Sequence, residues 1–104
     1  MMKKQIMLAC AAGMSTSLLV LKMRQAAEEK KLEVDILALP VTEAEEYVKH
    51  HSVDLILLGP QVAYQLKYLE ELFAEKIPVA VIPMVDYGMM NGNNVIALAE
   101  GLMR

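Results

Sequence analysis

The chain has 104 residues, enough for one domain with a single hydrophobic core and too few for two. Its formal net charge of −3 and its lack of a Lys/Arg cluster argue against a nucleic-acid partner. A single cysteine cannot form an internal disulfide, so a reducing cytoplasm is the expected compartment.

Short apolar runs alternate with amphipathic segments along the whole chain. The pattern predicts, in chain order, a strand at Gln5–Cys10, a helix capped by Ser15 or Thr16, a strand at Val34–Leu39, a short helix at Glu43–His50 capped by Thr42, a strand at Val53–Leu58, a helix at Gln61–Phe73, a strand at Val79–Ile82, a turn at Tyr87–Gly92 and a last helix at Val95–Met103. None of the apolar runs approaches the roughly 20 residues that span a bilayer. The run before Cys10 is also too short for the core of a cleaved signal peptide. We therefore expect a soluble protein without direct membrane insertion.

This alternation of strands and helices predicts an α/β fold. Short connections favour a single three-layer domain over residues 1–104, with a four-stranded parallel sheet covered by helices on both faces. With the strand order 2-1-3-4, the order reverses between the first and third strands, where such sheets bind ligands. The loop after Cys10 and the turn Gly59-Pro60-Gln61 would then face each other.

The stretch LACAAGMSTSLLV, residues 8–20, places the only cysteine on an uncharged loop at the start of a helix. Gly13 allows consecutive backbone amides to turn toward an anion, and the helix N-terminus favours negative charge. The predicted site has Cys10 as nucleophile and a phosphate-binding loop of Ala11, Ala12, Gly13, Met14, Ser15, Thr16 and Ser17. A small buried cysteine beside a hydroxyl-capped helix is the alternative, and the residues alone leave both open.

Three motifs together resemble one family: CAAGMSTSLLV at residues 10–20, LLGPQVAY at 57–64 and YGMMNG at 87–92. In this order they resemble the enzyme IIB component of the lactose/cellobiose (chitobiose) class of the bacterial phosphoenolpyruvate-dependent sugar phosphotransferase system. The resemblance runs the whole length of the chain. It implies that residues 1–104 form one IIB domain of the type 3 class.

The resemblance also implies an activity and two protein partners. Cys10 would accept a phosphoryl group from a phosphohistidine of enzyme IIA, forming a phosphocysteine. It would then pass the group to a β-linked disaccharide of the cellobiose, chitobiose or lactose type, imported through the membrane component IIC. The protein would act at the inner face of the membrane through IIC, and no cofactor is expected.

The fold and loop are also similar to those of the low-molecular-weight tyrosine phosphatases, whose signature is C-x5-R-[ST]. Thr16 stands at the arginine position of that signature, and Arg24 falls well into the following helix. An arginine at this position would stabilise the transition state of hydrolysis, so its absence favours a phosphocysteine that survives until a partner takes the group. A stand-alone phosphatase-like hydrolase remains the alternative function.

A few further residues are candidates for supporting roles. Gln61 follows the Gly-Pro turn and could contact the phosphate or a partner, or simply be a surface residue. Asp86 follows the fourth strand, where a phosphatase-like protein could place a general acid. Without an arginine, however, a carboxylate there would repel a phosphate dianion. His50 and His51 lack further ligands at metal spacing, so no metal is expected. We expect the methionines in the core, except Met14 at the rim of the loop.

Overall fold

The computed structural model describes residues 3–11, 16–73 and 76–103. The α-helices and strands are, in chain order, β1 (Lys4–Cys10), α1 (Ser17–Glu29), β2 (Val34–Pro40), α2 (Ala44–His50), β3 (Leu55–Leu58), α3 (Leu66–Phe73), β4 (Val79–Val81), α4 (Met84–Gly88) and α5 (Gly92–Leu102). Two 3-10 helices, η1 (Val41–Glu43) and η2 (Pro60–Gln65), precede α2 and α3. The strands form one parallel sheet in the order β2-β1-β3-β4, which confirms the predicted topology.

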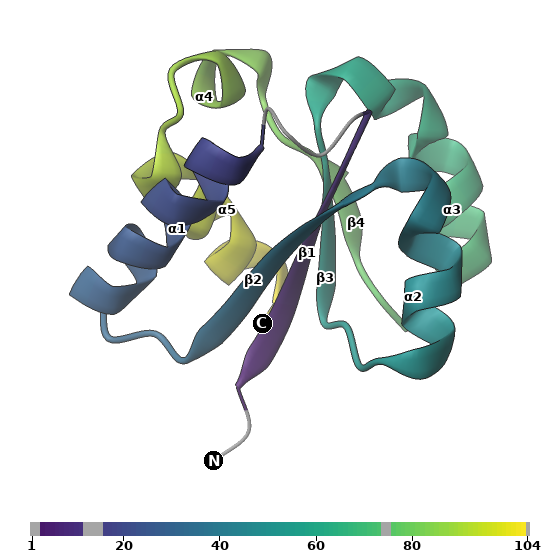
Figure 1. Cartoon of the computed structure of the whole chain (residues 1–104), viewed down its shortest axis with the longest axis horizontal. Coiled ribbons are helices and arrows are strands. Elements are labelled where there is room, and N and C mark those ends of the chain that lie inside the picture. Colours follow the sequence, from purple (N-terminus) through teal and green to yellow (C-terminus); the bar gives the residue numbers. More distant parts are fainter. Residues whose placement is uncertain (1–2, 12–15, 74–75, 104) are drawn as a thin grey trace.

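Both faces of the sheet are buried under helices (Figure 1). Ile6 and Leu8 of β1 pack into a core shared with α1 and α5, whereas Met7 and Ala9 pack into a second core shared with α2 and α3. Successive strand residues point to opposite faces, so a strand buried on both sides must be apolar at every position. This is why the strands read as continuous apolar runs, and it confirms the three-layer α/β prediction.

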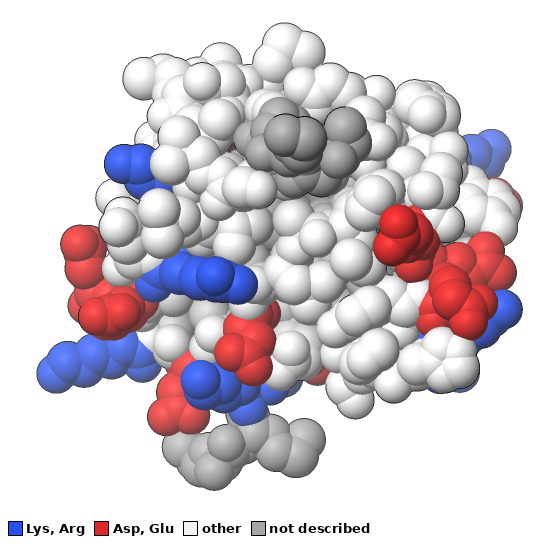
Figure 2. Space-filling model, viewed as in Figure 1, with Lys and Arg blue, Asp and Glu red and all other residues white. Residues whose placement is uncertain are grey.

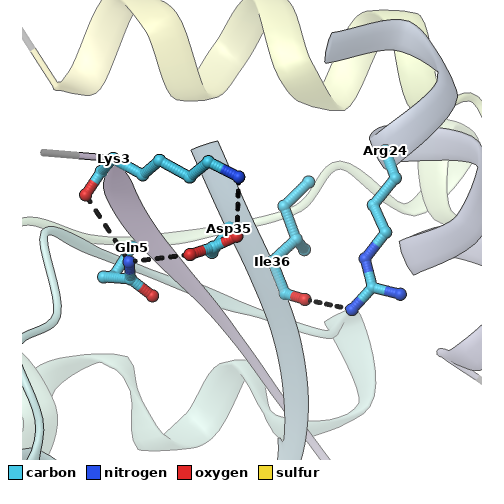
Figure 3. A network of polar contacts seen from close by, with 5 residues as sticks. All are labelled: Lys3, Gln5, Arg24, Asp35 and Ile36. Atoms are coloured by element: carbon cyan, nitrogen blue, oxygen red, sulfur yellow. Dashed lines mark hydrogen bonds and ion pairs between the residues drawn. The ribbon is translucent and has the colours of Figure 1, made fainter. Parts of the chain in front are cut away.

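One of the two edges of the sheet is formed by β2, and polar side chains from nearby segments lie along it (Figure 3). Arg24 of α1 donates a hydrogen bond from Nη2 to the Ile36 carbonyl at 2.7 Å. At the strand's start, the Asp35 carboxylate accepts from Gln5 Nε2 at 3.1 Å and lies 3.7 Å from Lys3 Nζ. Arg24 is therefore engaged at the sheet edge, and it occupies a carbonyl that could otherwise pair with another strand.

The segment predicted as one helix over Gln61–Phe73 is two helices. Residues Pro60–Gln65 form η2, and α3 begins only at Leu66. Pro60 starts η2 after an extended Gly59, and Val62 has non-helical angles (φ −117°, ψ 24°) that separate the first turn from the rest. The prediction of a single helix was wrong because helical spacing alone does not reveal this kink.

The predicted turn at Tyr87–Gly92 is also partly helical. Tyr87 and Gly88 belong to α4, and Met90 makes the reversal with a left-handed φ of 53°. Asn91 then caps α5, because its Oδ1 accepts a hydrogen bond from the Asn94 amide at 3.0 Å. This cap starts α5 at Gly92, three residues before the predicted start.

The predicted helix cap at residue 42 is wrong, whereas the one at residue 16 has the predicted position without a side-chain capping bond. Glu43, rather than Thr42, is the N-cap residue of α2, because residues Val41–Glu43 form η1. Thr16 is the N-cap residue of α1, yet within the described first turn its hydroxyl accepts no capping hydrogen bond. Ser15, the other candidate, lies outside the described residues.

The start of α5 lies directly against the backbone of α1. A Cβ added at Gly92 would come within 2.4 Å of the carbonyl carbon and oxygen of Lys22, and within 2.8 Å of the Met23 nitrogen. These are backbone atoms that cannot move aside individually. Gly92 is therefore required for the close packing of α5 on α1.

We expect Gly92→Ala to lower the free energy of unfolding by about 1–3 kcal/mol, because the two helices must separate to admit the methyl group. Gly101→Ala in the same helix is the matched control, since a Cβ there meets nothing within 4 Å. This control should raise stability by about 0.5–1 kcal/mol through helix propensity alone. Urea unfolding of the two variants measures both effects, and equal stability of the two would contradict the close approach.

Candidate functional site

Cys10 is the last residue of β1 and lies at the carboxyl edge of the sheet. Its residue is only 1% exposed. The Cys10 Sγ lies 3.4 Å from Thr16 Oγ1 and 3.5 Å from the Leu39 carbonyl oxygen, to which the thiol donates. The sulfur is therefore contacted by the Thr16 hydroxyl at the start of α1 and by the Leu39 carbonyl at the end of β2.

The turn after β3 lies against Cys10, as predicted. The Gly59 amide donates to the Ala9 carbonyl at 2.9 Å, which ties the end of β3 to the end of β1. A Cβ added at Gly59 would lie 3.7 Å from Cys10 Cβ, 3.6 Å from Tyr87 Cε2 and 3.2 Å from Gln61 Oε1. Cys10, Gln61 and Tyr87 thus converge on Gly59, where an added Cβ would be tight only against Gln61 and would make ordinary contacts with the other two.

The predicted site residues fall into two groups. Cys10, Ala11, Thr16, Ser17 and Gln61 are described, whereas the predicted phosphate ligands Ala12, Gly13, Met14 and Ser15 lie outside the described residues. Thr16 is buried, at 1% exposure, while Ala11, Ser17 and Gln61 are exposed. The structure therefore brings together a buried pair, Cys10 and Thr16, whose chain neighbours Ala11 and Ser17 are exposed.

Tyr87 belongs to this site although the sequence placed it in a turn. It lies in α4 and is only 7% exposed, with its ring against Gly59. Its neighbour Asp86 is a structural residue: Oδ1 accepts from Asn94 Nδ2 at 2.9 Å, and its carbonyl accepts from the Asn91 amide. The signal for Tyr87 was its place in the third motif, just after the fourth strand.

The two adjacent histidines at the end of α2 are engaged separately. His50 Nε2 lies 2.9 Å from Glu46 Oε2, and the His51 ring stacks on Tyr47 with 4.1 Å between ring centroids. Within residues 3–11, 16–73 and 76–103, no cluster of three or more metal-ligating side chains occurs. The described residues thus provide no ready metal centre.

Several of the described side chains over the carboxyl edge of the sheet are apolar and exposed. Figure 2 shows charged side chains gathered at the flanks and the lower half, and white surface around the grey residues of the upper half. Met84 and Met89 are each 74% exposed, and Val85 and Tyr64 are also exposed. The expectation that these methionines belong to the core is therefore wrong: around α4 they form part of an exposed apolar rim.

Residues 5–98 match the family described as the PTS system, lactose/cellobiose specific IIB subunit. The chain belongs to this family. This confirms the resemblance carried by the three motifs and identifies the protein as a IIB component of the sugar phosphotransferase system.

Related proteins named for different sugars resemble this IIB chain. The galactose-specific EIIB component of Lactococcus lactis subsp. cremoris is 44% identical, and the alignment covers 99% of each chain. The solution structure of the cellobiose-specific IIB component from Borrelia burgdorferi has a TM-score of 0.78 at 39% identity, over 98% of this chain and 93% of that one. The lactose-specific IIB domain from Streptococcus pneumoniae has a TM-score of 0.86 at 13% identity, over 99% and 100%, and this shows the shared fold.

No helix in the described part of this IIB chain is both long and apolar enough to cross a membrane.

Gly59→Ala should move the Gln61 amide while leaving the IIB fold intact. Gly59 has angles that alanine adopts readily (φ −64°, ψ 150°), and its Cβ would make only one tight contact, 3.2 Å to Gln61 Oε1. Because Gln61 is exposed and flexible, we expect stability to change by less than about 1 kcal/mol. The Gln61 side-chain amide resonances in an NMR spectrum should shift; resonances that move no more than in Gly101→Ala would refute the contact.

Proposed function

We propose that this IIB chain is a phosphocarrier that uses Cys10 as its phosphoryl acceptor. One observation carries the proposal: the only cysteine ends the central strand β1 at the carboxyl edge, with its sulfur held by Thr16. Parallel α/β sheets place their ligand sites at this edge, where the strand order reverses. The neighbouring N-terminus of α1 favours a bound anion.

In the first step, the Cys10 thiolate attacks the phosphorus of a phosphohistidine on enzyme IIA in line. The S–P bond forms as the N–P bond breaks, and the histidine nitrogen keeps the bonding electrons and takes the proton that the thiol has lost. Backbone amides of residues 11–17 are proposed to hold the transferred group. Gln61 is proposed to contact it, or the partner, from the opposite side.

In the second step, a hydroxyl oxygen of the sugar attacks phosphorus and the S–P bond breaks, which restores the thiolate. The proton of that hydroxyl must go to a base. Asp86 is the carboxylate of α4, the helix that also carries Tyr87, and its Oδ1 already accepts a hydrogen bond from Asn94. We therefore assign the base to the membrane component IIC.

Two features favour a carrier over the alternative hydrolase. Thr16 stands where the phosphatase signature has arginine, and the side chain of Arg24 is bound to the β2 edge. A guanidinium at the site would stabilise the equatorial oxygens during attack by water. Without one, the phosphocysteine is expected to persist until a partner receives the phosphoryl group.

The apolar rim suits docking of the two proposed partners. Both IIA and IIC with its sugar must reach the same sulfur, so they must bind in turn at the same face. Met84 and Val85 of α4, Met89 at the end of that helix and Tyr64 of η2 present exposed side chains there. Relatives of this chain carry the names of galactose, cellobiose and lactose systems, so we assign the choice of sugar to IIC rather than to the Cys10 site.

The phosphoryl acceptor is tested by intact mass spectrometry after incubation with a phosphorylated IIA of the lactose/cellobiose type. Wild type should gain one phosphate, and Cys10→Ser should gain none over the same time, because a neutral hydroxyl is a much weaker nucleophile than a thiolate. Equal gain in both proteins would refute Cys10 as the acceptor.

The hydrolase alternative is tested in parallel with an aryl phosphate substrate. A carrier should show no sustained turnover of this substrate. Multiple turnovers that disappear in Cys10→Ser would favour the hydrolase instead.

Met84→Asp should slow phosphoryl acceptance from IIA on the order of tenfold, about 1.4 kcal/mol, because it places a charge in the apolar rim. The matched control is Leu72→Asp, an exposed apolar residue near the end of α3 and away from the carboxyl edge. The rate of phosphate gain measured by mass spectrometry should fall only in Met84→Asp. An equal rate in both variants would contradict docking at the rim.

A further inference from the structure

Among the described residues, Thr16 and Leu39 each place a group beside the Cys10 sulfur, and these two groups favour opposite protonation states. The Leu39 carbonyl oxygen, at 3.5 Å, can only accept a hydrogen bond, so it stabilises the thiol that donates to it. The Thr16 hydroxyl, at 3.4 Å, can also donate. Once the thiol has lost its proton, the carbonyl repels the sulfur, while the hydroxyl can turn its own proton toward it.

The Thr16 hydroxyl lies close enough to the sulfur for this task. Threonine at an N-cap position ordinarily accepts a hydrogen bond from an amide in the first turn of the helix. Thr16 accepts no such bond from the described first turn of α1, and its backbone has helical angles (φ −91°, ψ −8°). Its side chain instead lies beside the sulfur and is almost fully buried, at 1% exposure. The contact with Cys10 Sγ therefore places a hydroxyl that can donate directly beside the sulfur.

We propose that Thr16 is a catalytic residue whose hydroxyl donates a hydrogen bond to Cys10 Sγ whenever the sulfur carries negative charge. This proposal rests on the phosphocarrier function. The sulfur is negative just before the S–P bond forms and again as that bond breaks. A donor at the sulfur therefore assists both acceptance of the phosphoryl group and its departure to the sugar.

The proposed role of Thr16 differs from the role of the residue at the same position in the phosphatase signature. In the C-x5-R-[ST] signature, the residue six places after the cysteine is an arginine that serves the phosphoryl oxygens. Here the same position supplies a neutral donor to the sulfur. Such a donor stabilises the thiolate of Cys10 before attack and stabilises the sulfur as the leaving group afterwards. It does so without drawing charge onto the phosphoryl oxygens, which suits transfer to a docked partner.

The other described neighbours of Cys10 carry no formal charge. They are the Leu39 carbonyl from β2, Gly59 from the β3–η2 turn and, across Gly59, the Tyr87 ring from α4. Tyr87 is the one of these three neighbours that has an ionisable side chain. The effect of the Thr16 hydroxyl on the thiolate should therefore be measurable without a strong competing charge from these groups.

The first test measures the thiolate directly by its ultraviolet absorbance as a function of pH. Thr16→Val removes the hydroxyl at nearly constant volume, and Thr16→Ser keeps it. Since Cys10 is the only cysteine, the corresponding Cys10→Ser protein of each variant serves as the blank. Thr16→Val should shift the thiolate titration to higher pH by about one unit, a tenfold loss of thiolate at a given pH. Thr16→Ser should titrate like wild type.

The second test measures phosphoryl transfer in both directions with the same variants. Thr16→Val should slow both gain of phosphate from phosphorylated IIA and its loss to the sugar through IIC on the order of tenfold, and Thr16→Ser should restore both rates. If Thr16→Val does not fold, as judged by thermal unfolding, Thr16→Ala compared with Thr16→Ser gives the same contrast.

The outcomes separate this inference from the carrier function. If Thr16→Val or Thr16→Ala titrates like Thr16→Ser and wild type, the role of Thr16 is overturned, even if wild type still gains a phosphate. If wild type gains no phosphate, the carrier function fails, and the titration still reports whether the hydroxyl holds the thiolate.

Discussion

The parallel pairing of β1 on both of its sides determines where the only cysteine lies. Residues 4–10 of β1 pair with β2, and residues 6–9 pair with β3, so the end of β1 is flanked on both sides. The Leu39 carbonyl comes from one neighbour and Gly59 from the other. A strand at the sheet edge could not surround a sulfur in this way, so the proposed chemistry depends on the strand order as much as on the loop.

What distinguishes the proposed carrier from a hydrolase is where positive or donor groups are placed. The arginine of α1 binds the Ile36 carbonyl at the sheet edge, which protects that edge from pairing with another strand. At the cysteine, the structure offers the neutral hydroxyl of Thr16 instead. An arginine near the sequence motif is therefore no sign of phosphatase chemistry by itself; its hydrogen-bond partner decides its role.

The sheet could be predicted from the sequence because strands buried on both faces are apolar at every position, and this pattern needs no knowledge of distant residues. The boundaries of the helices near the site could not be predicted in this way. The kink at Val62 and the early start of α5 depend on turn geometry and on the Asn91 cap. The role of Thr16 was missed for a similar reason: a hydroxyl before a helix predicts a cap, and only the fold places it beside Cys10.

The methionines on α4 were expected in the core, and their exposure fits the proposed need to dock two partners. Met84 and Met89 are exposed beside the site, whereas Met7 and Met23 are buried. Methionine has a flexible, polarisable side chain that can adapt to differently shaped apolar surfaces. An uncharged, methionine-bearing rim can therefore accept one partner that delivers the phosphoryl group and another that removes it. A rim built on ion pairs would have to match the charges of both partners at once, which is a harder requirement for one small surface.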